Sequence, residues 1–192
     1  MSTDTISMTE YHHKEGNNRL GLWLFIVSDA FMFIGLLVAR FYLLGSDQHP
    51  EANQFLGLGI TTVLLLSSYF MFRAETLMSF GDLKGFLRNA LLTLVLGTIF
   101  LIGVVLVEWP MAPGRPSDGA TWSIFFTMTG FHAFHVLTGL LLLLIVWRKA
   151  RKDMYTAERH WAVEAAAVYW HFIDVVWMFY YPALYLIGNP VK

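Results

Sequence analysis

Cysteine is missing from this 192-residue sequence, and charge is scarce. The lack of cysteine excludes disulfides, iron–sulfur clusters, thiolate-bridged copper centres and cysteine-ligated zinc or haem. Only 14% of the residues are charged, against about 25% in a typical soluble domain. The formal net charge is −1, which gives no indication of nucleic-acid binding. Apolar residues make up 56% of the chain, which indicates an integral membrane protein of a single domain.

Five apolar stretches are long enough to cross a bilayer, which takes about 20 residues for a helix. Prolines and polar residues separate them, and tryptophans lie at several of their ends, where amphipathic rings favour the interface. The predicted fold is an all-α bundle of five transmembrane helices in residues 19–192. It is preceded by a polar tail, 1–18, without the pattern of a signal peptide. The expected spans are Leu20–Leu44, Phe55–Phe72, Ala90–Val107, Trp122–Trp147 and Trp161–Ile187.

Lysine and arginine are distributed unevenly between the two sides of the membrane. Ten of the 13 fall on the side of the amino terminus and three on the other. Since basic residues favour the cytoplasmic side, the amino terminus is expected in the cytoplasm and the carboxyl terminus outside. Four of the ten are candidates for contacts with anionic lipid headgroups: Arg73, Arg88, Arg148 and Lys149.

Five ionisable side chains fall near the middle of the membrane. At a rise of about 1.5 Å per residue, each lies roughly 15–20 Å from one end of its helix. His132 and His135, and likewise His171 and Asp174, are three residues apart, so each pair shares a helix face. Because an isolated charge in hydrocarbon is costly, the first, fourth and fifth helices are expected to pack around one buried polar seam. Its members are Asp29, His132, His135, His171 and Asp174.

The residues alone leave the role of this seam open. The plainest interpretation is interhelical hydrogen bonding that fixes the packing. A b-type cytochrome would use His132 or His135 with His171 as haem ligands, and a small proton-coupled carrier would be centred on Asp29 and Asp174. The sequence shows no nucleophile–base arrangement, its loops are too short for a catalytic domain, and no metal site is expected. These features favour a subunit of a larger membrane complex.

Four segments, in order, resemble subunit III of the haem–copper oxidases. They are LGLWLFIVSDAFMFIGLLVARF (Leu20–Phe41), GTIFLIGVVLVEW (Gly97–Trp109), TGFHAFHVLTGLLLLLIVW (Thr129–Trp147) and YWHFIDVVWMFYYPALYLIG (Tyr169–Gly188). The resemblance extends from Arg19 to the end of the chain and includes the H-x-x-H and W-H-x-x-D polar positions. It implies the short, five-helix form of the subunit, in the inner membrane of a bacterial cell. The accessory five-helix subunit of a nitric oxide reductase is the alternative that shares this pattern.

The resemblance also implies a role. Subunit III carries no redox cofactor, stabilises subunit I of a terminal oxidase that reduces oxygen to water and translocates protons, and is associated with proton uptake. Subunit I would be the main partner, with subunit II, a fourth subunit and bound phospholipids as further partners. Asp29 matches the family's membrane-embedded acid, which is usually glutamate, and Glu108 matches an acid near the end of its span. Asp29 is expected to contact His135 or His132.

Overall fold

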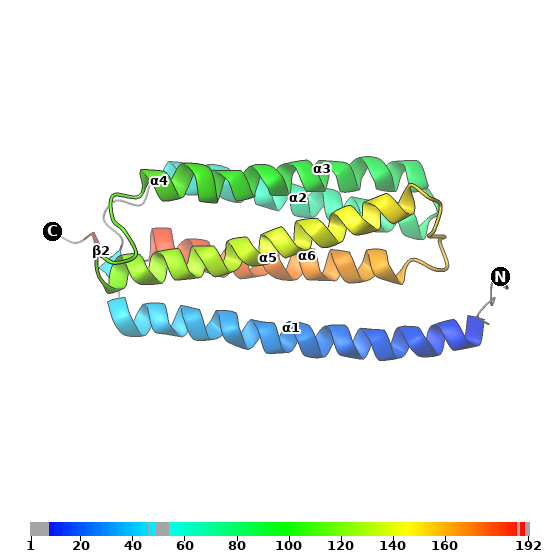
Figure 1. Cartoon of the computed structure of the whole chain (residues 1–192), viewed down its shortest axis with the longest axis horizontal. Helices are drawn as coiled ribbons and strands as arrows, with labels where there is room; N and C mark the ends of the chain where they lie inside the picture. The colour runs from blue at the N-terminus through cyan, green and yellow to red at the C-terminus, as the bar shows by residue number, and fades with distance from the viewer. Residues whose placement is uncertain (1–7, 46, 49–53, 188, 191–192) are drawn as a thin grey trace.

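The computed structural model describes residues 8–45, 47–48, 54–187 and 189–190. Five helical rods, each long and apolar enough to cross a membrane, run side by side (Figure 1). One rod is made of α3, η1 and α4, and another of α6 and η2, where η denotes a π-helical segment. The predicted all-α fold with five transmembrane helices is therefore confirmed. The elements are α1 (Met8–Leu44), β1 (Asp47–Gln48), α2 (Gln54–Ser79), α3 (Leu83–Ile102), η1 (Gly103–Glu108), α4 (Trp109–Met111), α5 (Ala120–Ala150), α6 (Trp161–Tyr181), η2 (Pro182–Leu186) and β2 (Asn189–Pro190).

α1 begins at one end of the bundle and η2 finishes at the other, as an odd number of spans requires (Figure 1). We call the end where α1 begins the proximal end and the end where η2 finishes the distal end. At the distal end, β1 and β2 pair in parallel, with Asp47 opposite Asn189 and Gln48 opposite Pro190. This short pairing joins the segment after α1 to the segment after η2.

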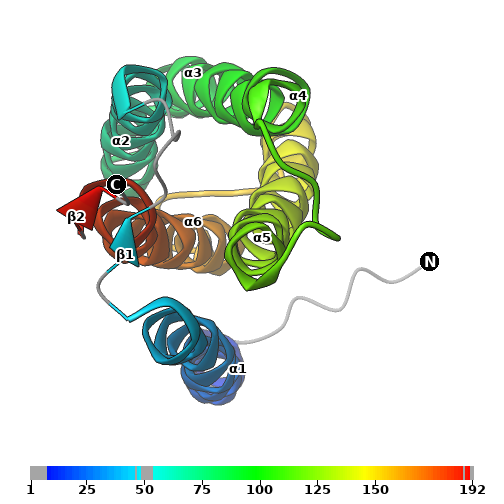
Figure 2. The same cartoon turned by 90° about the vertical axis from the view of Figure 1, so that its left-hand side faces the viewer.

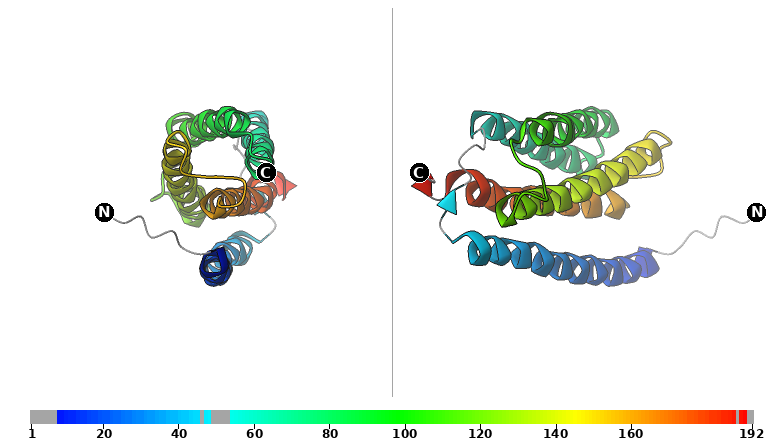
Figure 3. Two further views of the ribbon diagram at one scale, coloured as in Figure 1. Left: turned by 90° about the vertical axis from the view of Figure 1, so that its right-hand side faces the viewer. Right: turned by 60° about the vertical axis from the view of Figure 1, so that its left-hand side comes forward.

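Seen end-on, α2, α3, α5 and α6 surround a common centre, and α1 lies to one side, against α5 and α6 (Figure 2). From α1, Phe33 is buried with the core residues of the other rods. The same arrangement is visible from two further directions (Figure 3). In α1 only 11% of the most apolar 18-residue window is buried, compared with 50% in α5 and α6. α1 is thus attached to the bundle along one side and exposes the rest of its surface.

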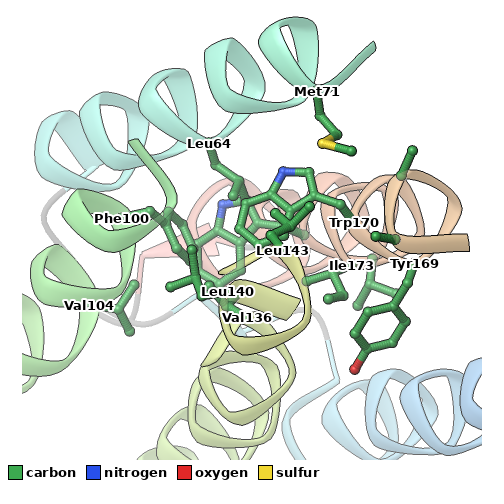
Figure 4. Packing of buried hydrophobic residues seen from close by; sticks show 14 of the residues in the cluster. Leu64, Met71, Phe100, Val104, Val136, Leu140, Leu143, Tyr169, Trp170 and Ile173 are labelled. Atoms are coloured by element: carbon green, nitrogen blue, oxygen red, sulfur yellow. The ribbon is translucent and has the colours of Figure 1, made fainter. Parts of the chain in front are cut away.

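The Trp170 side chain lies near the centre of the core, among aliphatic and aromatic residues of α2, α3 and α5 (Figure 4). Two glycines allow this position: a Cβ at Gly97 would lie 2.5 Å from the indole, and one at Gly139 would lie 3.0 Å from it. The indole nitrogen donates to the hydroxyl of Ser67 at 3.2 Å. The Trp170 side chain is therefore fixed by packing and by one hydrogen bond to α2.

The helices extend beyond the expected spans at the proximal end. α1 begins at Met8 rather than Leu20, so part of the expected polar tail is helical. α2 continues to Ser79 and α3 begins at Leu83, which leaves only residues 80–82 to connect them. Asp82 caps α3, because its Oδ1 accepts from the Gly85 N–H at 2.9 Å. Apolar composition indicates where the membrane lies, whereas caps determine where a helix ends.

Candidate functional site

Asp29 of α1 lies against His135 of α5 in the middle of the bundle. The distance from His135 Nε2 to Asp29 Oδ2 is 3.0 Å, and the two side chains are 8% and 14% exposed. Asp29 Oδ2 is at ion-pair distance from His135, but no donor within the described ranges meets it in hydrogen-bonding geometry. The rings of Phe33 and Phe131 lie 4.8 and 4.6 Å from the imidazole. Aromatic side chains thus surround the contact and leave it little access to water.

The other ring nitrogen restricts the protonation states of this pair. His135 Nδ1 lies 2.7 Å from the carbonyl oxygen of Phe131, which can only accept, so Nδ1 carries a hydrogen. The pair can then be a carboxylic acid beside a neutral ring or a carboxylate beside an imidazolium. A carboxylate beside a neutral ring would leave a buried charge uncompensated. Each of the first two arrangements places one proton between Asp29 and His135.

His132, one turn away from His135, occupies a different environment. Its side chain is fully buried, and neither ring nitrogen has a hydrogen-bond partner among the residues that the structure describes. The imidazole lies 4.8 Å from the ring of Trp177 and 5.8 Å from that of Phe100. It is thus held by aromatic packing from α6 and α3, and the contact with Asp29 is made by His135.

His171 and Asp174 face α2. His171 Nδ1 lies 2.7 Å from the hydroxyl oxygen of Ser68, and Asp174 lies beside the same serine. Asp174 is 6% exposed, and in the described part of the chain its Oδ1 has no hydrogen-bond partner. Neither side chain belongs to the contact that α1 makes with α5.

The expectation of a single polar seam is corrected by these positions. Side chains three residues apart on a helix point about 60° apart, which is enough to separate His132 from His135. On α6, the polar face meets serine and threonine side chains of α2, which lie within an apolar run and so give no polar signal in the sequence. Besides Ser68, these are Ser67, which accepts from Trp170, and Thr61, which accepts from the Trp177 indole at 2.9 Å.

Arg40 is a structural residue that its sequence position did not reveal. It is only 1% exposed, although it lies near the distal end of α1. Its guanidinium donates to the carbonyl oxygens of Ala183 and Gly45 at 2.8 Å each, and to that of Ile187 at 3.2 Å. Pro182 begins η2, where the α-helical hydrogen-bond pattern ends, and Arg40 satisfies carbonyl groups there. The arginine therefore attaches α1 to the end of the last rod.

At the proximal end, α1 is attached by a second charged contact. Arg19 donates to Glu15 at 2.8 Å and to Glu164 of α6 at 2.9 Å, and it lies over the Trp161 ring. His160 lies 3.2 Å from the other oxygen of Glu164. α1 thus has three charged side chains in contact with the bundle, Arg19, Asp29 and Arg40. In addition, the carbonyl oxygen of Phe33 accepts from the Tyr180 hydroxyl of α6 at 3.1 Å.

The remaining residues singled out in the sequence lie near the ends of the rods. The four basic candidates for lipid headgroups, Arg73, Arg88, Arg148 and Lys149, are exposed near the proximal end. Glu108 is buried at the distal end of η1, where it accepts from the Tyr185 hydroxyl. Within the part of the chain that the structure describes, no group of three His, Cys, Asp or Glu side chains is placed to hold a metal ion.

Comparison with known proteins identifies the family. The model of the family "Cytochrome c oxidase subunit III" matches residues 5–189. The chain belongs to this family. It is 32% identical to cytochrome c oxidase subunit 3 of Thermostichus vulcanus, over 97% of this chain and 96% of that protein. Proteins of the same name from a Synechocystis species and from Bos taurus are 34% and 35% identical, over 97% and 89% of this chain and 83% and 70% of theirs.

Membership of the subunit III family makes the chain part of a respiratory terminal oxidase. The cytochrome c oxidase relatives do not favour the nitric oxide reductase alternative. The structure and the family agree on a five-helix membrane subunit, and they assign the chain to a complex that reduces oxygen.

Proposed function

We propose that this chain is a non-catalytic subunit that stabilises subunit I of the oxidase. The observation that carries this proposal is that polar groups near the middle of the membrane contact one another within the chain. Asp29 pairs with His135, and His171 with Ser68, each across two helices. His132 is enclosed by aromatic rings. These histidines serve the internal packing of the chain, so haem and copper are assigned to partner subunits. Subunit I is the main contact, with subunit II and a fourth subunit as further partners.

The proposed location is the inner membrane of a bacterial cell, with the proximal end in the cytoplasm. The uneven distribution of basic residues supports this orientation. In that orientation the single proton of the Asp29–His135 pair lies midway across the membrane. We assign to it a supporting role in proton uptake by the oxidase.

Removal of the chain from the purified oxidase tests this function. The depleted complex should retain the haem spectrum and a similar initial rate of oxygen reduction, but lose activity in fewer turnovers than the intact complex. Adding the chain back should restore the longer activity. Loss of a haem band in proportion to the chain removed would contradict the proposal, because the chain would then hold a redox centre.

Bound phospholipid is the other proposed partner. An apolar groove of about 360 Å³ lies between α1 and α6, lined by residues such as Ile34 and Phe179. Its size suits an acyl chain, and the exposed basic residues of the proximal end suit anionic headgroups.

Neutralising the basic candidates tests the headgroup contacts. The combined substitution of Arg73, Arg88, Arg148 and Lys149 by glutamine should reduce the anionic phospholipid retained by the complex in native mass spectrometry. The matched control is Arg115→Gln, at the distal end, which should leave lipid retention unchanged. Equal retention of anionic phospholipid in both variants would show that the four residues serve only to orient the chain in the membrane.

A further inference from the structure

A second buried carboxyl group lies far from the Asp29–His135 pair. Glu108 is the last residue of η1 and is 7% exposed. It follows Gly97, Phe100 and Val104 at intervals of three or four residues, so it lies on the helix face that packs into the bundle. Oε1 of Glu108 accepts from the hydroxyl of Tyr185, which belongs to η2 and is itself fully buried.

The surroundings of this carboxyl group are aromatic. The Tyr185 ring stacks on Tyr181 with centroids 5.2 Å apart and meets Phe125 edge-on at 6.3 Å. Gly57 of α2 lies against the same tyrosines, since a Cβ there would be 3.1–3.2 Å from their rings. The close packing of α2, η1, α5 and η2 removes Glu108 from the lipid and from most water.

The second oxygen of Glu108 lacks a partner. Oε2 is buried and has no hydrogen-bond donor among the residues that the structure describes. In the same part of the chain, no lysine, arginine or histidine lies within ion-pair distance of Glu108. A buried carboxylate with one neutral donor and no countercharge is costly, whereas a carboxylic acid in the same position is not.

We propose that Glu108 and Tyr185 form a second proton-binding site, at the distal end of the bundle. At rest Glu108 is a carboxylic acid with its proton on Oε2, while Oε1 accepts from Tyr185. Release of the proton to a water molecule gives hydronium and a carboxylate, and Tyr185 continues to donate to that carboxylate. Glu108 is three residues from Met111, where the rod ends, a distance of about 4.5 Å along the axis, so the exchange takes place with water at the distal surface.

Infrared spectroscopy of the intact oxidase complex tests this site. A protonated carboxyl group has a carbonyl-stretch band that a carboxylate lacks. The difference between wild type and Glu108→Gln should contain such a band at neutral pH, and the band should shift on transfer to D2O. Tyr185→Phe should move the frequency of the band without removing it, because the acid remains and loses only the hydrogen bond to Oε1. The matched control is Asp118→Asn, an exposed acid at the same end, which should leave the band unchanged.

Selective labelling covers the case in which Glu108→Gln fails to assemble. With 13C-carboxyl glutamate, the band that responds to Tyr185→Phe should shift with the label, which separates it from Asp29 and Asp174. If no glutamate carbonyl band of the wild type responds to Tyr185→Phe, the proposal is overturned, because Glu108 would then be ionised. A band that fails to shift in D2O would also overturn it, because a proton that does not exchange with water serves packing alone.

Discussion

At the scale of single residues, the contacts between buried polar side chains determine how the helices pack. Asp29 and His135 are the one acid–imidazole contact that the described residues make between α1 and α5. His135 Nδ1 bonds to a backbone carbonyl, so Nε2 is the ring nitrogen that faces Asp29. Removing either member therefore changes the other, and the two side chains should act as a unit.

The Asp29–His135 contact should appear as coupling in a double-mutant cycle. Asp29→Asn and His135→Ala are each expected to lower the free energy of unfolding of the bundle. The loss in the double variant should be about 1 kcal/mol smaller than the sum of the losses in the two single variants. Unfolding in mixed micelles measures this free energy. Asp29→Glu should preserve the pair, because it retains the acid.

A matched cycle controls for this measurement. Asp29→Asn combined with Ser68→Ala joins two sites with no shared partner, so their effects should add within about 0.5 kcal/mol. Coupling of the same size in both cycles would show that the Asp29–His135 contact has no energy of its own.

At the scale of elements, α1 is the helix with the least support from packing. Its attachment depends on Arg19, Asp29 and Arg40, and of these Arg40 makes the most extensive contacts. Arg40→Met should leave buried carbonyl groups of η2 unpaired and lower the free energy of unfolding by about 3 kcal/mol. Arg40→Lys should recover only part of this loss, since an ammonium group lacks the planar fork of the guanidinium.

Hydrogen exchange provides the local readout of the Arg40 substitution. Amides of residues 183–187 should exchange faster in Arg40→Met, while those at the centre of α5 should stay protected. Arg115→Met, at an exposed position of the same end, is the control and should change the free energy of unfolding by less than about 0.5 kcal/mol. Unchanged exchange in η2 would contradict the role assigned to Arg40.

The packing of α3 against α6 predicts a contrast between two glycines. Gly97→Ala would place a Cβ 2.5 Å from the Trp170 ring and should destabilise the bundle by about 1–3 kcal/mol. Gly35→Ala on α1 meets nothing within 4 Å and should be neutral or slightly stabilising. Thermal denaturation of both variants measures the contrast, and equal melting temperatures would refute the account of this interface.

At the scale of the whole molecule, the sequence was sufficient for the architecture and for one contact. Long apolar stretches specify five spans because a bilayer demands about 20 apolar residues from each. Depth arithmetic also placed Asp29 level with His135. The depth of a residue does not give its direction around the helix axis. The sequence therefore predicts that His171 and Asp174 face the first and fourth helices, whereas in the structure they face α2. The role of Arg40 does not follow from the sequence, because two of its carbonyl partners, Ala183 and Ile187, lie in or just after a π-helical turn far along the chain. Nothing in the local sequence indicates which side chain will reach that turn.

The most direct measurement is affinity purification of this chain from its native membrane in a mild detergent. The partners would be identified by mass spectrometry, and a reduced-minus-oxidised spectrum recorded on the eluate. We predict recovery of subunit I of a haem–copper oxidase, with its haem bands in the spectrum. A chain that purified alone and without colour, or a haem spectrum without any partner protein, would contradict the central claim that this is a non-catalytic subunit of a terminal oxidase.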